Sequence, residues 1–203
     1  MNQGIDRNVE QNIMTDAVQV VADRAFPAHL QWSATEAVVA STTGIHAAVT
    51  ASNSAATVVT TDFTQPACAK NVTATAGGTA ADIKAVQVIV EGTNMNDEVI
   101  SETLPVFTEN TAGSVTGSKA FKTVTKMTIP AMDGAAATVA LGFGEKLGLP
   151  FKIAHDTVLK SYRNNTLEGT AATVTVSSTA LESNTIDLNS ALNGSVVDVY
   201  LLV

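Results

Sequence analysis

The chain has 203 residues, of which 45% are hydrophobic but only 4% aromatic, and it carries a formal net charge of −8. This length suits one β domain, or one domain with an arm, and so acidic a chain lacks the basic footprint that nucleic-acid binding requires. Charged residues make up only 15%, and a composition rich in threonine and valine favours stacked sheets with threonine-rich outer faces, or surfaces that partner subunits cover.

Cysteine content and the N-terminus bear on the compartment. Cys68 is the only cysteine, which excludes an intramolecular disulfide framework and a cluster of thiolates around a metal. The first residues, MNQGIDRNVEQ, lack the apolar core of a signal peptide. No stretch approaches the ~18 uninterrupted apolar residues of a membrane span. We therefore expect a protein made in a cytosol-like compartment, with neither membrane nor nucleic acid among its partners.

Residues 1–30 differ in character from the rest of the chain. Val9, Ile13 and Val20 stand among polar and charged residues at a loosely helical spacing, and the segment ends at Phe26-Pro27. Either a short helix or an extended N-terminal arm fits this spacing. A segment this polar would add little to a core, so we expect it to lie against the domain or a neighbour, with a β-sandwich domain over residues 31–203.

From residue 36 onward, short strand-like runs alternate with glycine and proline turn signals, and no long amphipathic helix interrupts them. Outside a central hairpin, the predicted strands are EAVVA (36–40), HAAVT (46–50), ATVVTT (56–61), KNVTATA (70–76), KTVTKMTI (122–129), AATVALG (136–142), TVLKSY (157–162), ATVTVSS (172–178) and SVVDVYLLV (195–203). The pattern predicts an all-β fold, an antiparallel β-sandwich of Greek-key or jelly-roll-like type, rather than alternating strands and helices.

The clearest single unit is the central hairpin. IKAVQVIVEG (83–92) is followed by the polar stretch TNMND and by EVISETLPV (98–106). Val88 and Val90 fall on one face of the first run, and Gln87 and Ile89 on the other. Two alternating runs around a polar connection of four or five residues predict a β-hairpin.

GSVTGSKAFKT (113–123) has some features of a phosphate-binding loop. Such a loop requires G-x-x-x-x-G-K-[ST] between a buried strand and a helix, whose N-terminus supplies much of the anion affinity. Here the glycines are one residue too close, Ser118 precedes Lys119 instead of following it, and the continuation KTVTKMTIP is strand-like. The sequence therefore predicts a glycine turn between two strands and no nucleotide site.

LGFGEKLGLP (141–150) resembles a dinucleotide fingerprint in part. Gly142 and Gly144 follow a strand, but the third glycine, Gly148, comes one position late, and Pro150 prevents a helix. We expect these glycines to serve positive-φ positions in a tightly packed loop.

The histidines and the cysteine give no catalytic or metal site. His29, His46 and His155 are far apart and have no partner at ligand spacing, so we expect each at the surface or at a strand edge. Cys68 has no assigned base and follows Pro66 in a turn, which does not favour a nucleophile.

The acidic cluster Asp97, Glu98 and Glu102 does not suit catalysis either. Glu98 and Glu102 share one face of a strand, but at the usual rise they are about 13 Å apart, too far for acid–base work on one bond. The sequence thus predicts that the protein is not an enzyme, with no catalytic residues, no cofactor and no metal.

Charge is unevenly distributed along the chain. Residues 110–163 contain seven basic and three acidic residues, a balance of +4, whereas the remainder contains four basic and sixteen acidic residues, a balance of −12. The lysines could simply solubilise a β surface. Alternatively, a basic face of one copy could meet an acidic face of another copy or of a scaffold.

Several segments share a recognisable pattern: CAKNVTATA (68–76), VQVIVEGTNMNDEVISETL (86–104), GSKAFKTVTKMTIP (117–130), TVALGFGEKLGLP (138–150) and, more weakly, ALNGSVVDVYLLV (191–203). Together they resemble a family of tailed-bacteriophage virion structural proteins, of the head decoration or cement type. The resemblance covers about residues 66–150 and departs in the hairpin loop, where Asn96 and Asp97 stand in place of a usual glycine.

The resemblance implies a non-enzymatic capsid decoration protein that binds the major capsid protein and stabilises the head shell through subunit contacts. It implies a homo-oligomer, with a trimer favoured, that is assembled in the host cytoplasm and located in the virion head. Cementing requires only buried area, roughly 25 cal/mol per Å² less the ordering costs, and a symmetric lattice adds multivalency.

Two alternatives stay open. Similar domains could serve as a tail, connector or baseplate component. The chain could instead be an adhesin module that binds host-surface carbohydrate, although only Trp32, Tyr162 and Tyr200 could offer it Trp or Tyr ring faces.

Overall fold

A computed structural model of the chain describes residues 11–14, 19–22 and 26–203, the first two segments by their backbone alone. Every strand pairing in these residues is antiparallel. Helical structure in this part of the chain is limited to two single turns, η1 (Ala80–Asp82) and η2 (Leu181–Ser183). The predicted all-β antiparallel sandwich is confirmed.

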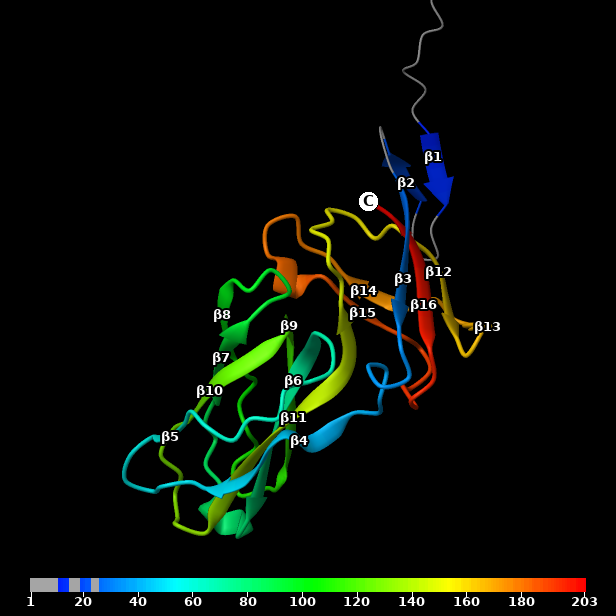
Figure 1. Cartoon of the computed structure of the whole chain (residues 1–203). Helices are drawn as coiled ribbons and strands as arrows, with labels where there is room; N and C mark the ends of the chain where they lie inside the picture. The colour runs from blue at the N-terminus through cyan, green and yellow to red at the C-terminus, as the bar shows by residue number, and fades with distance from the viewer. Residues whose placement is uncertain (1–10, 15–18, 23–25) are drawn as a thin grey trace, which may run out of the picture.

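The strands of residues 11–14, 19–22 and 26–203 form four sheets (Figure 1). A two-stranded sheet joins β1 (Gln11–Met14) and β2 (Gln19–Ala22). A second sheet has the order β5 (Thr57–Val59), β10 (Thr123–Ile129), β7 (Ile89–Thr93), β8 (Val99–Thr103). The third has the order β14 (Thr173–Thr175), β15 (Thr185–Asp187), β11 (Ala137–Gly148), β6 (Lys70–Gly78), β9 (Gly113–Phe121), and β4 (Ser41–Thr50) also pairs with β11. The fourth has the order β13 (Thr166–Leu167), β12 (Val158–Arg163), β16 (Val197–Leu202), β3 (Pro27–Trp32).

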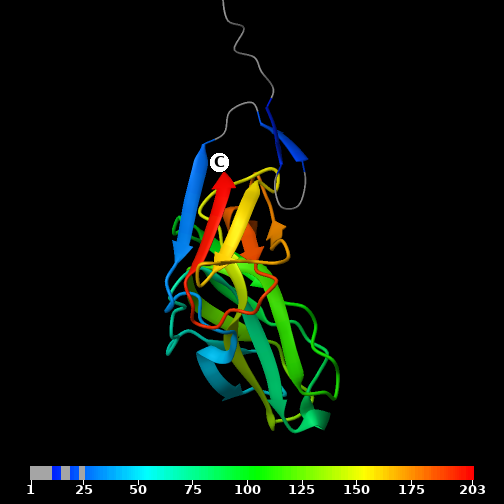
Figure 2. The same ribbon diagram turned by 90° about the vertical axis from the view of Figure 1, so that its right-hand side faces the viewer.

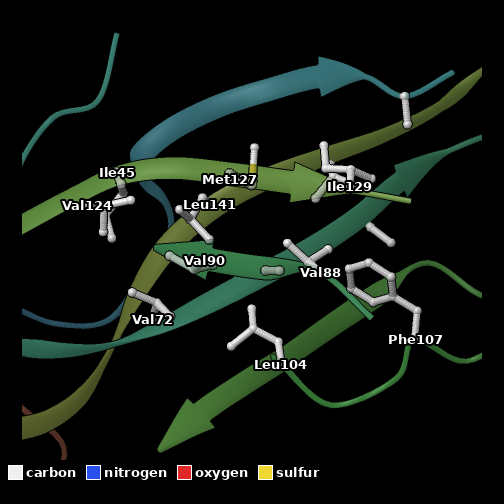
Figure 3. Packing of buried hydrophobic residues seen from close by; sticks show 14 of the residues in the cluster. Ile45, Val72, Val88, Val90, Leu104, Phe107, Val124, Met127, Ile129 and Leu141 are labelled. Carbon is white, nitrogen blue, oxygen red and sulfur yellow. The ribbon is translucent and has the colours of Figure 1, made fainter. Parts of the chain in front are cut away.

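The first of two hydrophobic cores lies between the second and third sheets. Its buried side chains come from β4, β6, β7, β8, β9, β10 and β11 and from the segments that connect them, and Val72, Val90, Met127 and Leu141 have essentially no exposed surface. Figure 3 shows these side chains gathered among the strands of the two sheets. Apart from a few phenylalanines this core consists of aliphatic residues and methionines, as expected from the low aromatic content.

The second core lies behind the fourth sheet. Val197, Val199 and Leu201 of β16 point into it, together with Trp32 of β3 and Val158 of β12. Because side chains alternate along a strand, the intervening residues of these strands lie on the opposite, outer face. Figure 2 shows β3, β16 and β12 side by side at the front of the molecule.

Strand β11 connects the two cores. Val139 and Leu141, near its start, belong to the first core, whereas Leu147, near its end, belongs to the second. The long strand therefore runs through both halves of the elongated molecule (Figure 1).

Apart from Phe26, the described part of residues 1–30 consists of strands. Strand β1 pairs with β2, and β3 begins at Pro27 and pairs with β16 along its length. The fourth sheet therefore starts before residue 31, where the sequence placed the domain boundary. The other residues of the expected arm, 1–10, 15–18 and 23–25, lie outside the described residues.

The strand predicted at residues 36–40 is wrong. The carbonyl of Ser33 accepts hydrogen bonds from the N–H groups of Glu36 and Ala37, which makes a turn. The Glu36 carboxylate accepts in return from the N–H and the hydroxyl of Ser33, at 2.8 and 2.7 Å. A glutamate carboxylate that accepts from the N–H of the serine three residues earlier is the glutamate half of a capping box, and this capping turn outweighs the strand propensity of the valines that follow.

The glycine turn predicted at Gly117 is also wrong, because residues 113–121 form strand β9, paired with β6. Likewise, Gly142, Gly144 and Gly148 lie within strand β11 and not in a loop, and none of them has a positive φ. Gly142 has no room for a side chain because strand β4 passes close to it. A Cβ at this position would lie 1.7 Å from the carbonyl oxygen of Ser41 on β4.

The central hairpin is confirmed. Thr93 pairs with Val99, so residues 94–98 form the connection, and Val88 and Val90 are buried as expected. Strand β7 begins only at Ile89. In the connection, Asp97 adopts a φ of +62°. An aspartate therefore provides the left-handed conformation in a loop where the resembling family usually has glycine.

Candidate functional site

Residues 113–123, which have some features of a phosphate-binding loop, bind a carboxylate of the same chain. The buried carboxylate of Glu102, on β8, accepts hydrogen bonds from the N–H and the hydroxyl of Ser118, at 2.7 and 3.0 Å. It also accepts from the N–H of Lys119, 3.3 Å from each of its oxygens. A Cβ at Gly117 would lie 2.5 Å from Glu102 Oε2. Ser118 and Lys119 therefore bind an internal glutamate and link β9 to the edge of the neighbouring sheet.

The lysines of the basic segment have acidic partners within the chain. Lys126 Nζ lies 2.8 Å from Glu91 Oε1 on the paired strand β7. Lys122 Nζ lies 2.7 Å from Asp97 in the hairpin connection. Lys119 Nζ lies 3.5 Å from Glu182 and donates to the carbonyl of Ser101. Each of these three lysines is therefore paired with a carboxylate from outside residues 110–163. Together the three lysines do not form an unpaired basic face.

Asn71, which lies in the first segment of the family-like pattern, links strands β6, β9 and β11 through its side chain. Its side chain is buried, donates to the carbonyl of Gly117 at 3.0 Å and accepts from the N–H of Lys146 at 3.1 Å. A Cβ at Gly144 would lie 2.6 Å from Asn71 Oδ1. The amide and the glycine therefore fit one another where β11 and β6 lose their regular register.

Lys70 is a buried amine that forms no ion pair with a carboxylate of the described residues. Its Nζ donates to the carbonyl of Val38 at 2.8 Å and lies 4.9 Å from the centre of the Phe143 ring. Burial lowers the pKa of Lys70, and nearby Glu145 offsets this in part. Its contacts hold the segment after the capping turn against β6, which is a structural role.

Cys68 is half-buried, and its surroundings disfavour the reactive thiolate form. Its thiol donates to the carbonyl of Glu36, with Sγ 3.6 Å from the oxygen. Burial raises the pKa of Cys68 to about 11, so the thiol stays protonated near neutral pH. The thiolate is the nucleophilic form of cysteine, and burial disfavours it here.

The three histidines are widely separated. His155 is exposed, and His46 on β4 contacts the ring of Phe63 and the carbonyl of Ala47. His29 on β3 differs, because its Nε2 donates to Asp198 Oδ1 at 2.8 Å and its ring stacks on Tyr200, with centroids 4.5 Å apart and planes 5° apart. It is the histidine that belongs to a group of polar and aromatic side chains.

That group lines a surface hollow of about 430 Å³ on the outer face of the fourth sheet, hereafter the polar hollow. Its lining residues are His29, Gln31, Tyr162, Asn165, Asp198 and Tyr200. The strand register explains the grouping, because Tyr200 lies opposite His29, and Asp198 lies between Gln31 and Tyr162 on the two flanking strands. Two of the three Trp and Tyr residues noted in the sequence therefore meet here, whereas Trp32 is buried in the second core.

Sequence reasoning missed Gln31, Asn165 and Asp198 as members of one site. The alternation in PAHLQW and VDVYLL was a usable signal, since it places the polar residues of each run on one face. The sequence did not reveal that residues 27–32 pair with residues 197–202, because the two segments lie near opposite ends of the chain.

Searches for related proteins give no support for an assignment: no family model, no curated protein and no solved structure matches the chain. Among the described residues, no group of three or more His, Cys, Asp or Glu side chains could hold a metal ion. In the same part of the chain, no helix has the length and apolar character to cross a membrane.

Proposed function

We propose that this protein is a non-enzymatic structural component of a tailed-bacteriophage virion, a head decoration protein that binds the major capsid protein and stabilises the shell. The observation that carries the proposal is the pattern of several segments within about residues 66–150, which together resemble that family.

The contacts of the pattern residues support a structural reading of the resemblance. Glu102 and Gly117 fit together between β8 and β9, and Asn71 and Gly144 fit together between β6 and β11. Gly92 is a further case, since a Cβ there would lie 1.9 Å from the carbonyl oxygen of Thr123. These residues maintain close strand packing in and beside the first core, as expected where a pattern specifies a fold and not a chemistry.

The edges of the second sheet provide surface suited to subunit contacts. Val99 on the edge strand β8 is 85% exposed, and Val58 on the opposite edge strand β5 is 53% exposed. Exposed apolar residues on open strand edges favour association with another chain. In the proposed role, neighbouring copies or the capsid surface cover them.

The proposal includes self-association, with a trimer favoured, in the virion head. Purified protein should therefore have the mass of a trimer in solution. A ring of six or twelve copies would instead favour the alternative of a tail or connector component.

Co-sedimentation tests capsid binding directly. Heads prepared without this protein are mixed with the purified full chain and separated on a gradient. The chain should sediment with the heads and saturate at a fixed number of copies per head. Failure to co-sediment at any concentration would contradict the proposal.

A truncation tests the role of the N-terminal arm. The structure indicates that the deletion should end at residue 25, because Phe26 exchanges two backbone hydrogen bonds with Val203 and β3 begins at Pro27. We expect the 26–203 protein to fold and to lose head binding. Retained binding would show that the arm is not the attachment element.

A further inference from the structure

We propose that the polar hollow is a carbohydrate-binding site, which takes one pyranose ring of a cell-surface glycan. This inference goes beyond the proposed decoration role and does not depend on it, because the hollow belongs to the fourth sheet alone. A decoration protein with such a site would display a sugar-binding surface wherever the virion exposes it.

The sheet gives the hollow a rigid floor. Val197, Val199 and Leu201 anchor β16 in the second core, so Asp198 and Tyr200 project from the other face. The central position of β16, between β12 and β3, restrains both side chains. A site on paired strands is positioned more precisely than one on loops.

A tight turn positions the amide at the rim. Asn164 and Asn165 both have positive φ, 51° and 59°, and they connect the paired residues Arg163 and Thr166. A two-residue connection with two left-handed residues is a type I′ hairpin turn. Asn165 therefore lines the hollow from a turn that has little conformational freedom.

The aromatic rings supply the apolar surface that the C–H groups of a sugar require. Tyr200 is 41% exposed, stacks on His29 and meets Tyr162 nearly at right angles, with centroids 6.0 Å apart. Tyrosine combines an apolar ring with a hydroxyl that both donates and accepts. The volume of about 430 Å³ is within the range of small-molecule sites.

The polar groups supply both donors and acceptors. Asp198 Oδ1 accepts from His29 Nε2 and Gln31 Nε2, each at 2.8 Å. Its Oδ2 accepts no hydrogen bond from any described residue, and the amide side chains of Gln31 and Asn165 also line the hollow. Carboxylate, amide and phenol groups together match the alternating donors and acceptors of vicinal hydroxyls.

This mixture favours a neutral polyhydroxyl ligand over a cation. An ammonium or guanidinium ligand would use only Asp198 Oδ2 and the ring faces, since Oδ1 already accepts from two donors. The amides and phenols would then contribute little, whereas a sugar uses all of them.

The test applies the full-length protein to an array of pyranosides and bacterial surface glycans, followed by calorimetry with the best-binding free sugar. We expect binding to one glycan class. Tyr200→Ala and Asp198→Asn should each weaken the affinity at least tenfold. Phe26→Ala serves as the matched control, because it removes an exposed ring near β3 that does not line the hollow, and it should change the affinity less than twofold.

Asn165→Gly keeps the test valid if Tyr200→Ala fails to fold. Glycine adopts the left-handed conformation of position 165 without strain, so the variant removes only the amide, and the affinity should fall at least threefold. The proposal is overturned if the array shows no glycan above background. Equal weakening by Phe26→Ala, or binding of tetramethylammonium in the hollow by a protein that binds no glycan, would overturn it as well.

Discussion

The carboxylate of Glu102 occupies the space that a side chain at position 117 would need, with Oε2 2.5 Å from the Cβ position of Gly117. The same carboxylate is bound by the two residues that follow, Ser118 and Lys119. A stretch with features of a phosphate-binding loop is therefore a strand whose backbone N–H groups hold a glutamate from the adjacent sheet.

Replacing Gly117 should destabilise the fold. In Gly117→Ala the new methyl group would clash with the Glu102 carboxylate, and overpacking of this kind costs about 1–3 kcal/mol. Chemical denaturation would measure the loss in the free energy of unfolding. Gly113→Ala on the same strand is the matched control, since nothing lies within 4 Å of its Cβ position, and it should stay within about 0.5 kcal/mol of wild type. Equal effects of the two substitutions would contradict the proposed fit.

A double-mutant cycle tests the same contact from its other side. Glu102→Ala alone leaves the N–H groups of Ser118 and Lys119 without their acceptor, which costs about 1–3 kcal/mol. In the double variant Glu102→Ala/Gly117→Ala the methyl group gains room, so the combined loss should be smaller than the sum of the single losses. Relief should be partial, because Leu104 Cδ2 also lies 2.8 Å from the Cβ position of residue 117. Strict additivity would show that the two residues do not interact.

A charge swap tests the internal ion pairs. Lys126→Glu places two carboxylates opposite one another on β10 and β7, and for a partly exposed pair the loss should be at most about 1 kcal/mol. Adding Glu91→Lys should restore the stability, and head binding should be unchanged in the swapped protein. If the swap restores stability but abolishes head binding, Lys126 contacts an acidic neighbour outside the chain.

Thiol modification tests the environment of Cys68. With a pKa of about 11, only about one thiol in a thousand is ionised at pH 8, about a hundredfold fewer than at the ordinary value of 9.0. Alkylation by iodoacetamide should therefore be about a hundredfold slower in the native protein than in guanidinium, and should accelerate with pH up to about 11. A native rate at pH 8 equal to the unfolded rate would contradict burial of the thiol.

The raised pKa of Cys68 also predicts a pH dependence of stability. The folded protein disfavours the thiolate, so the unfolded state releases this proton first as the pH rises. The contribution is fully present below about pH 9 and is lost between about pH 9 and 11. A Cys68→Ser variant should lack this part of the decline, and an identical decline in both proteins would assign it to other groups.

Elements that depend on the local alternation of side chains along a strand were predicted correctly from the sequence. The hairpin of β7 and β8 was recognisable because two strand-like runs, the first with Val88 and Val90 on one face, stand on either side of a polar connection. The run at 36–40 also contains adjacent valines, but the reciprocal hydrogen bonds of Ser33 and Glu36 form a turn instead. Glycines misled the interpretation at 117 and 142–148, because there they permit close contact with Glu102 and Ser41 and do not mark turns.

The polar hollow could not be predicted because its members come from both ends of the chain. His29 and Tyr200 are brought together only when β3 pairs with β16, and a single sequence does not reveal the pairing of such distant strands. The scarcity of aromatic residues counted against a sugar site. Their position matters more than their number, since Tyr162 and Tyr200 lie within one hollow.

The proposed location in the virion has the most direct test. Cryo-electron microscopy of the virion that contains this protein should show the elongated two-core β structure on the outer surface of the head, in contact with the major capsid protein and present in trimers around symmetry positions. Density for the chain only in the tail, connector or baseplate, or its absence from the particle, would contradict the account.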